Sequence, residues 1–433
     1  MRKFDDLVED FSRRPVPLTH TVSGARIALI MVGISIALPG FLAGAQIGQT
    51  VGFQQSMTAF FAAGVILAAV GVMTSVVASR ARLSTYMLVQ LPFGTKGAKV
   101  VNFFLASTLF GWFGVNASLF GDAMIATLQT MGWWSAPAAV YVVIGSALMV
   151  ATTIFGFKAL DKLSLFAVPL LFIILVGILS ISLGRTDLDD LLAAGDRAMP
   201  LGLTISAVAG GNMVAVTTLP DLTRYLANGR QAVTAMFYAY VLGMPIILLS
   251  VAVPSLVSGE SDLMKIILGL GLGLPALLVL IFSTWTSNAA NLYSSGLSLA
   301  AVFTGIHRWK LTVMGGAFGI GIAVAGIVEA FVPFLIALSV VIPPIAGIYV
   351  TYFFLAKGAY NLDDLENAPA VGYPAFAAWM TGSGVAFLAV KEVITITGIP
   401  ALDSIFVAAG IYWLLQRLLS SAPLKPAPGD KLL

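Results

Sequence analysis

Apolar residues gather along this chain in long stretches that short polar connections separate. Twelve stretches have about 18 residues or more, the length that an α-helix needs to cross the hydrocarbon core of a bilayer. They cover residues 25–47, 56–79, 100–127, 136–156, 163–184, 201–221, 233–256, 268–302, 311–328, 331–355, 372–390 and 398–419. The pattern predicts an all-α membrane protein with twelve transmembrane helices.

Two of the stretches contain residues that interrupt a helix near the middle. Pro39-Gly40 interrupts the first stretch, and Gly210-Gly211-Asn212 interrupts the sixth. The bilayer core offers no water to the freed N–H and C=O groups, so a break is stable only where it faces protein, a ligand or a water-filled cavity. Paired breaks in corresponding stretches indicate the binding site of a secondary transporter that works by alternating access.

The spacing of the breaks predicts internal symmetry. They lie 171 residues apart, and the same offset carries Trp112 in the third stretch to Ser283 in the eighth. Because the breaks are separated by an odd number of stretches, the second unit must cross the membrane with the opposite polarity. We therefore predict one membrane domain over residues 1–433, with inverted repeats of five helices at 25–184 and 201–355 and two additional helices at 372–419.

Composition and charge fit this architecture. Hydrophobic residues make up 59% of the chain and charged residues 10%, whereas a soluble domain carries about 25% charged residues. If the N-terminus is cytoplasmic, all but four of the 23 Lys and Arg residues fall on the cytoplasmic side, as the positive-inside rule expects. We predict a multi-pass protein of the inner (cytoplasmic) cell membrane with both termini in the cytoplasm. The net charge of +3 then reflects topology, and no nucleic-acid partner is expected.

Other classes of protein fit less well. The chain has no cysteine, only two histidines and no His-Glu-x-x-His motif, so an intramembrane enzyme would lack a nucleophile with a base or a metal site. A passive channel fits poorly with the asymmetric helix breaks. We predict a transporter and not an enzyme, embedded in the lipid bilayer, with no obligate protein partner evident.

The eighth stretch has the densest polar run. Ser283, Thr286 and Ser287 are spaced i, i+3 and i+4, so they share one helix face. A single hydroxyl in a membrane helix usually bonds to its own or a neighbouring helix. Three hydroxyls on one face, opposite an expected break, favour a site for a small hard cation, which prefers oxygen ligands.

The third stretch offers a surface for a flat ligand. Trp112 and Asn116 lie one turn apart, so an indole face and an amide would meet the same molecule. This pair suits a planar heterocycle, although ordinary helix packing explains it equally well. In the sixth stretch, Gly211 and Asn212 would let the backbone and an amide approach the ligand, and close helix packing is again the alternative.

Charged residues inside the stretches are few, and each is a candidate for ion coupling. They are Asp122, Glu329, Lys391 and Glu392. All four lie near predicted boundaries, which favours solvated positions, and Asp122 is the first candidate if protons drive the protein. Asp221 and Arg224 are interpreted as a local pair at a helix end.

Motifs in the third, eighth and tenth stretches are distinctive in combination. They are Gly111-Trp112-Phe113-Gly114, Trp285-Thr286-Ser287-Asn288, Leu292-Tyr293-Ser294-Ser295-Gly296-Leu297 and Ile342-Pro343-Pro344-Ile345-Ala346-Gly347. From about Pro15 to the end of the twelfth stretch, the chain resembles nucleobase-cation symporter family 1, in its cytosine permease (purine-cytosine permease) branch. The resemblance implies the leucine-transporter-type fold of five-plus-five inverted repeats, with substrate between stretches one, three, six and eight.

The resemblance also implies Na+ as the coupling ion, where the first stretch meets the eighth. Its ligands would be the backbone carbonyls of Gly33, Ile36 and Ser283 and the hydroxyls of Thr286 and Ser287. These hydroxyls lie on the face that the spacing singles out. The substrate-binding residues that follow from the resemblance are Ala37, Leu109, Trp112, Asn116, Gly211, Asn212, Val214 and Asn288.

Three of these positions depart from the pattern of the cytosine permeases. Leu109 stands where they have a glutamine, Asn212 where they have an aromatic residue, and Val214 where they have a serine. A site built to hydrogen-bond its substrate rejects ligands without matching groups. We therefore predict sodium-coupled symport of a nucleobase (cytosine-like) or a related planar heterocycle. Proton-coupled transport of a purine, a hydantoin or allantoin, or a hydroxymethylpyrimidine-type substrate stays open as the alternative.

Overall fold

The computed structural model describes residues 11, 14–193, 199–330, 334, 337–338, 340–356, 365 and 367–419. Within these residues the regular structure is entirely helical, apart from an isolated β-bridge between Val22 and Leu226. The predicted all-α class is therefore confirmed.

The helices follow the apolar stretches closely. In chain order they are η1 (Leu18–His20), α2 (Gly24–Ser35), α3 (Leu38–Ala81), α4 (Thr85–Phe93), α5 (Gly97–Thr130), α6 (Ala138–Ile154), α7 (Phe157–Leu183), α8 (Leu188–Ala193), α9 (Leu201–Thr217), α10 (Pro220–Thr223), α11 (Gly229–Met236), the π-helix η2 (Phe237–Gly243), α12 (Met244–Ser258), α13 (Leu263–Gly269), α14 (Gly273–Val302), α15 (Arg308–Val324), η3 (Ile327–Ala330), α17 (Pro343–Leu355), α19 (Tyr373–Val390) and α20 (Pro400–Leu419).

Seven helical segments of the described chain are long and apolar enough to cross a membrane, and four shorter apolar helices accompany them. Among the seven, α3 contains the end of the first predicted stretch and all of the second, with a kink at Gly52 between them. The φ of 77° at this position is one that glycine adopts without strain. The count of twelve stays a prediction because part of the tenth stretch, 331–355, lies outside the described residues. The repeat boundaries at 25–184 and 201–355 stay predictions as well.

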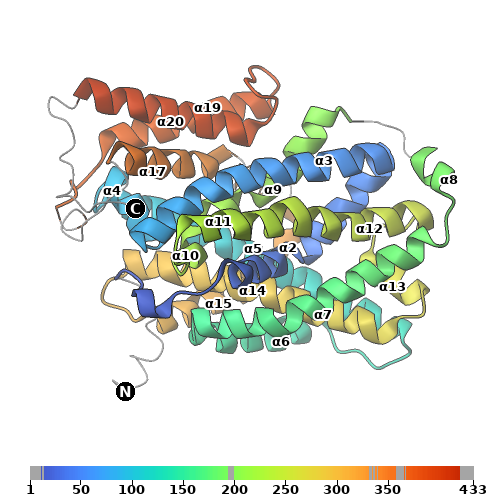
Figure 1. The fold of residues 1–433 in the computed structure, drawn as a ribbon. Helices are drawn as coiled ribbons and strands as arrows, with labels where there is room; N and C mark the ends of the chain where they lie inside the picture. Colours follow the sequence, from blue (N-terminus) through green and yellow to red (C-terminus); the bar gives the residue numbers. More distant parts are fainter. Residues whose placement is uncertain are drawn as a thin grey trace.

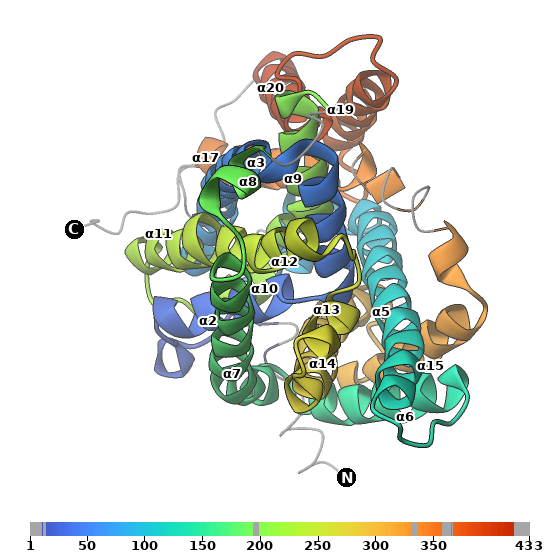
Figure 2. The ribbon, with the colours of Figure 1, turned by 90° about the vertical axis from the view of Figure 1, so that its right-hand side faces the viewer.

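The long helices run side by side (Figure 1, Figure 2). Among the membrane-length helices, α5 and α14 are more buried than α19 and α20. The helices α5 and α14 pack along each other, and α3 packs against α9 and α12. At the edge of the bundle, α19 and α20 pack on each other and against α17 (Figure 1). The central helices therefore bring the first, third, sixth and eighth stretches together, as the predicted fold requires.

The first stretch is broken, close to the position that the sequence predicts. The helix α2 ends at Ser35, Ile36 and Ala37 are not helical, and α3 begins at Leu38. Pro39 stands in the first turn of the new helix, where its missing N–H costs no hydrogen bond. The proline therefore follows the break rather than forming it, and the predicted interruption at Pro39-Gly40 is confirmed with a shift of about three residues.

The sixth stretch differs from the prediction. The helix α9 runs without interruption through Gly210, Gly211 and Asn212 and ends at Thr217. In a bilayer, a glycine that stays helical keeps its backbone groups hydrogen-bonded, and this outweighs its low helix propensity. The predicted break at this position is wrong. The glycines serve another purpose, because a Cβ at Gly211 would meet no atom within 4 Å and would point into open space.

Candidate substrate and cation site

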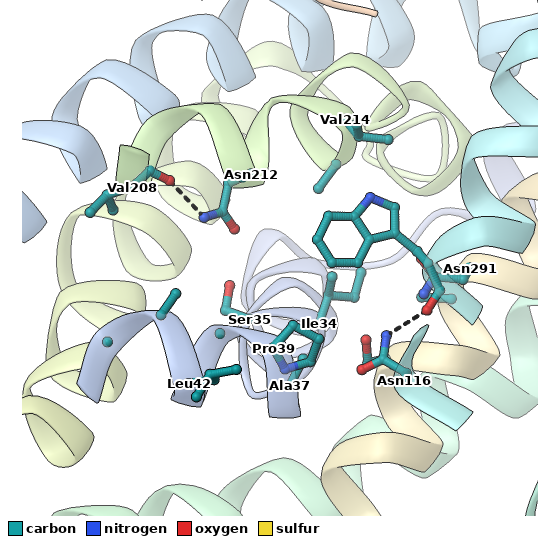
Figure 3. Close-up of a pocket in the computed structure, with 18 of the residues that line it drawn as sticks. Ile34, Ser35, Ala37, Pro39, Leu42, Asn116, Val208, Asn212, Val214 and Asn291 are labelled. Atoms are coloured by element: carbon teal, nitrogen blue, oxygen red, sulfur yellow. Dashed lines mark hydrogen bonds between the residues drawn. The ribbon is translucent and has the colours of Figure 1, made fainter. Parts of the chain in front are cut away.

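A cavity of about 480 Å³ lies beside the break between α2 and α3, and α5, α9 and α14 complete most of its lining (Figure 3). Seven of the eight residues predicted to bind substrate line it: Ala37, Leu109, Trp112, Asn116, Gly211, Asn212 and Val214. The volume suits a small heterocycle, since ligand pockets measure about 300 to 1,000 Å³.

The eighth predicted residue, Asn288, lies behind the cavity wall. It is buried, and its amide nitrogen donates to the Phe113 carbonyl oxygen at 3.2 Å. Its amide oxygen accepts a hydrogen bond from Asn291 at 3.4 Å, and Asn291 lines the cavity. Asn288 therefore orients Asn291, which is absent from the predicted site. Asn291 lies four residues after Ser287, on the same helix face, and this spacing is a signal that could have identified Asn291.

Polar groups of the cavity include an amide oxygen with no donor. The Asn116 nitrogen donates to the Trp112 carbonyl at 3.0 Å, while the Asn116 Oδ1 atom is buried and accepts no hydrogen bond from the described residues. An unsatisfied buried acceptor costs about 1–3 kcal/mol. An N–H or O–H group of a bound molecule would remove this cost, so the Asn116 oxygen is suited to hold a ligand that donates.

On the opposite side, Asn212 and Ser35 present two further polar groups (Figure 3). The Asn212 nitrogen donates to the Val208 carbonyl at 3.0 Å within α9, which fixes the amide and leaves its oxygen facing the cavity (Figure 3). The Ser35 hydroxyl donates to the Met31 carbonyl at 3.1 Å. The cavity thus offers acceptors on two sides, with apolar side chains between them.

The described residues that line the cavity carry no charged side chain. Asp122, the predicted candidate for proton coupling, is exposed on α5 and is not part of the lining. Lys391 and Glu392 are exposed beyond the end of α19, and the side chain of Glu329 lies outside the described residues. Because an unpaired charge is costly to bury, this cavity favours a neutral ligand.

The helix break frees a carbonyl that Thr286 then contacts. The Ala37 N–H donates to the Ser35 carbonyl at 3.1 Å, so it does not close the helical bond to Gly33. The Thr286 Oγ1 atom lies 3.2 Å from the Gly33 oxygen, 3.1 Å from the Ser283 oxygen and 3.0 Å from the Phe282 oxygen. Three carbonyl oxygens therefore converge on one hydroxyl where α2 meets α14.

The other predicted cation ligands lie close by in the chain. Ile36 caps the C-terminal end of α2, where carbonyl groups have no partner within the helix. Ser287 is one residue beyond Thr286 and lines the cavity, so the predicted cation ligands lie beside the cavity. In transporters with broken helices, unwound backbone carbonyls and the C-terminal ends of half-helices coordinate Na+. Within the described residues, no group of three or more His, Cys, Asp or Glu side chains could hold a metal ion.

Comparison with protein families decides the class of this chain. Residues 15–414 match the family model described as permease for cytosine/purines, uracil, thiamine, allantoin. The chain belongs to this permease family. It is therefore a membrane transporter and not an enzyme, in agreement with the prediction.

Relatives of known name include two kinds of permease. The cytosine permeases of Escherichia coli are 26–27% identical over 381 residues, which cover 86% of this permease and 88% of theirs. The hydantoin permease of Microbacterium maritypicum is 24% identical over 428 residues, covering 88% of this chain and 84% of its own. The predicted resemblance to nucleobase-cation symporter family 1 is confirmed.

Solved structures share the fold. Mhp1, a nucleobase-cation-symport-1 family transporter in a closed conformation with bromovinylhydantoin bound, superposes with a TM-score of 0.83 at 20% identity, covering 95% of this chain and 96% of its own. A Na+-coupled sialic acid symporter in a substrate-bound outward-open state gives a TM-score of 0.72 at 11% identity, covering 99% and 97%. The permease therefore has the transporter fold that the sequence predicts.

Proposed function

We propose that this permease is a sodium-coupled symporter of a neutral planar heterocycle, a nucleobase or a hydantoin-like ring. The observation that carries the proposal is the contact of Thr286 with the Gly33 carbonyl, at the helix break beside the cavity. A cation bound there would join α2 to α14 and hold the break in the shape that Ala37 and Ser287 present to the ligand. Binding of the two ligands would then be coupled, and such coupling is reciprocal.

The lining of the cavity supports the substrate class. Trp112 offers a ring surface, and its indole packs against Phe334 in an edge-to-face arrangement with ring centroids 5.8 Å apart, which limits its rotation. The uncharged amides of Asn116, Asn212 and Asn291 can accept from and donate to the edge of a ring. The proton-driven alternative based on Asp122 has less support, because that side chain is exposed outside the cavity. We also propose that both termini are cytoplasmic, from the distribution of Lys and Arg.

A ligand screen tests the proposal directly. Purified permease is heated with cytosine, uracil, a purine or a hydantoin, each in NaCl and in KCl of equal ionic strength. We expect at least one ring to raise the melting temperature in NaCl by several degrees more than in KCl, because a ligand that binds the folded state stabilises it. Stabilisation that is equal in the two salts would contradict sodium coupling, and a response to none of the rings would contradict the substrate class.

Replacing Asn116 with leucine separates binding from stability. Because the Asn116 oxygen has no donor in the described chain, its removal should leave the melting temperature unchanged or slightly higher. Ligand affinity should fall about tenfold to a hundredfold, the value of one or two hydrogen bonds to a polar ligand. Binding titrations check the affinity. A loss of stability with unchanged affinity would show that Asn116 has a structural role only.

A further inference from the structure

A buried carboxylate lies below the cavity at one end of the bundle. Asp221 belongs to α10, in the connection between α9 and α11, and it is completely buried. Its Oδ1 atom accepts a hydrogen bond from the Thr85 backbone N–H at 2.9 Å, in the first turn of α4. Its Oδ2 atom is also buried and has no hydrogen-bond partner of good geometry within the described chain. The interpretation of Asp221 and Arg224 as a merely local pair is therefore incomplete.

The buried side chain of Arg224 closes the same end of the molecule. Arg224 is completely buried, and its guanidinium donates to the Phe11 carbonyl at 2.8 Å and to the Tyr293 hydroxyl at 3.0 Å. The Tyr225 ring stacks on Phe157 at 3.9 Å between centroids. Phe11 thus lies against Arg224, the residue that follows α10. Asp221 has no surface exposed to water in the structure.

On its other side, Asp221 is one residue layer from the cavity. Thr218 and Leu222, which flank it in sequence, line the cavity, and so does Ser294 of α14. The Ser294 hydroxyl faces the carboxylate. The Thr85 hydroxyl donates to the Thr218 carbonyl at 3.3 Å, so α4 contacts both Asp221 and the floor of the cavity. A proton could reach Asp221 from the cavity by way of Ser294.

The surroundings of Asp221 shift its proton equilibrium toward the protonated form. Burial raises the pKa of Asp221 to about 6, although the positive charge of Arg224 and the groups of Thr85 and Ser294 lower it. The other titratable group that faces it is Tyr349 of α17, whose hydroxyl donates to the Thr217 carbonyl at 2.9 Å. Opening of this end would hydrate Asp221 and return its pKa toward the ordinary value of about 4. Protonation therefore stabilises the sealed state, and this contribution is lost as pH rises through about 6.

We propose that Asp221 is a proton-binding site of the transport cycle: it holds a proton while this end of the permease is sealed and releases it to water when the end opens. The proton converts the carboxylate to a carboxylic acid on binding and leaves as the carboxylate re-forms. The end in question is the one that the Lys and Arg distribution predicts to be cytoplasmic, so release would occur into the cytoplasm. The proposal rests on the permease working by alternating access, and it needs neither a sodium site nor a particular substrate.

Infrared difference spectroscopy on reconstituted permease tests the proton site itself. As pH falls from about 8 to about 5, the wild type should gain a protonated-carboxyl band with a midpoint near 6. Asp221→Asn should lack this band and should keep the neutral, hydrogen-bonding shape of the protonated residue. A spectrum in which the variant keeps the full band, or in which no carboxyl titrates in this range, would overturn the proposal.

Cysteine labelling tests the link to opening, because the chain has no cysteine of its own. A single Thr218→Cys reporter is placed in everted membrane vesicles and treated with an impermeant maleimide. Lys99→Cys, exposed at the start of α5 near the same end, corrects for the effect of pH on thiol reactivity. The corrected labelling rate should rise severalfold from about pH 5 to about pH 8, and adding Asp221→Asn should keep it low at both values.

Each outcome decides for or against the proposal. A corrected rate that does not change with pH in the Thr218→Cys permease contradicts the link to opening, even if Asp221→Asn fails to fold. A rate that still rises with pH in the Asp221→Asn variant assigns the effect to another group and overturns it too. Because both experiments omit sodium and substrate, their failure is distinct from failure of the sodium-coupled symport proposed above.

Discussion

Replacing Thr286 with alanine is expected to shift the effect of sodium on ligand binding to much higher sodium concentrations. The change deletes the hydroxyl on which the carbonyl oxygens of Gly33, Ser283 and Phe282 converge, and so removes one of five proposed cation ligands. We expect the sodium concentration for half-maximal effect to rise at least about tenfold, or about 1.4 kcal/mol. Titration of the heterocycle that most stabilises the wild type, at several sodium concentrations, measures this shift.

Matched variants separate a cation ligand from a structural hydroxyl. Thr284 is equally buried on α14, but its hydroxyl donates only to the Leu280 carbonyl of the same helix, at 2.9 Å. Thr284→Ala should therefore leave the sodium dependence intact, and Thr286→Ser should restore most of it. If Thr284→Ala shifts the sodium dependence as far as Thr286→Ala does, the oxygen cluster at Gly33 is not the cation site.

The sequence predicts the hydroxyl face of α14 and the break in the first stretch because the relevant information is local. Ser283, Thr286 and Ser287 share a helix face whatever the helix packs against, since the period of the α-helix fixes their directions. The break in the first stretch is also local, because a proline in the first turn of a helix marks where that helix begins. Neither inference needs the distance between two helices.

The sixth stretch shows the limit of the same reasoning. Two glycines followed by an asparagine lower helix propensity, but α9 passes through them with Asn212 bonded back to Val208. Propensity is worth about 1 kcal/mol per glycine, whereas each unsatisfied backbone group in a bilayer costs several. The backbone therefore stays helical, and the missing Cβ of Gly211 adds space to the cavity instead.

A sequence pattern does not predict which residues reach the cavity through the register between two helices. Asn291 lines the cavity because Asn288 bonds the Phe113 carbonyl of α5 and fixes the α5–α14 register. From the sequence, Asp221 is predicted to lie at the end of a helix. A carboxylate in such a position is usually solvated. Asp221 is buried, and it accepts a hydrogen bond from Thr85 at the start of α4, while its neighbour Arg224 donates to Phe11. Those contacts join parts of the chain far apart in sequence.

Replacing Trp112 with alanine is the sharpest test of the substrate class. If the ligand is a planar ring that stacks on the indole, the loss should be about 1–3 kcal/mol, which is about fivefold to about 150-fold in affinity. Trp112→Phe should recover part of it, since phenylalanine keeps a smaller ring face. Trp134→Ala is the matched control, because that indole is 84% exposed and outside the cavity.

The Trp112 variants also distinguish stacking on the ligand from packing within the protein. The Trp112 ring contacts Phe334, so its removal is expected to lower the melting temperature as well. Affinity must therefore be measured below the unfolding transition of each variant, by titration with the same heterocycle. Should Trp112→Ala bind that ring as tightly as the wild type does, the ligand does not stack on α5. The uncharged amides around the cavity would then have to recognise a non-planar neutral molecule.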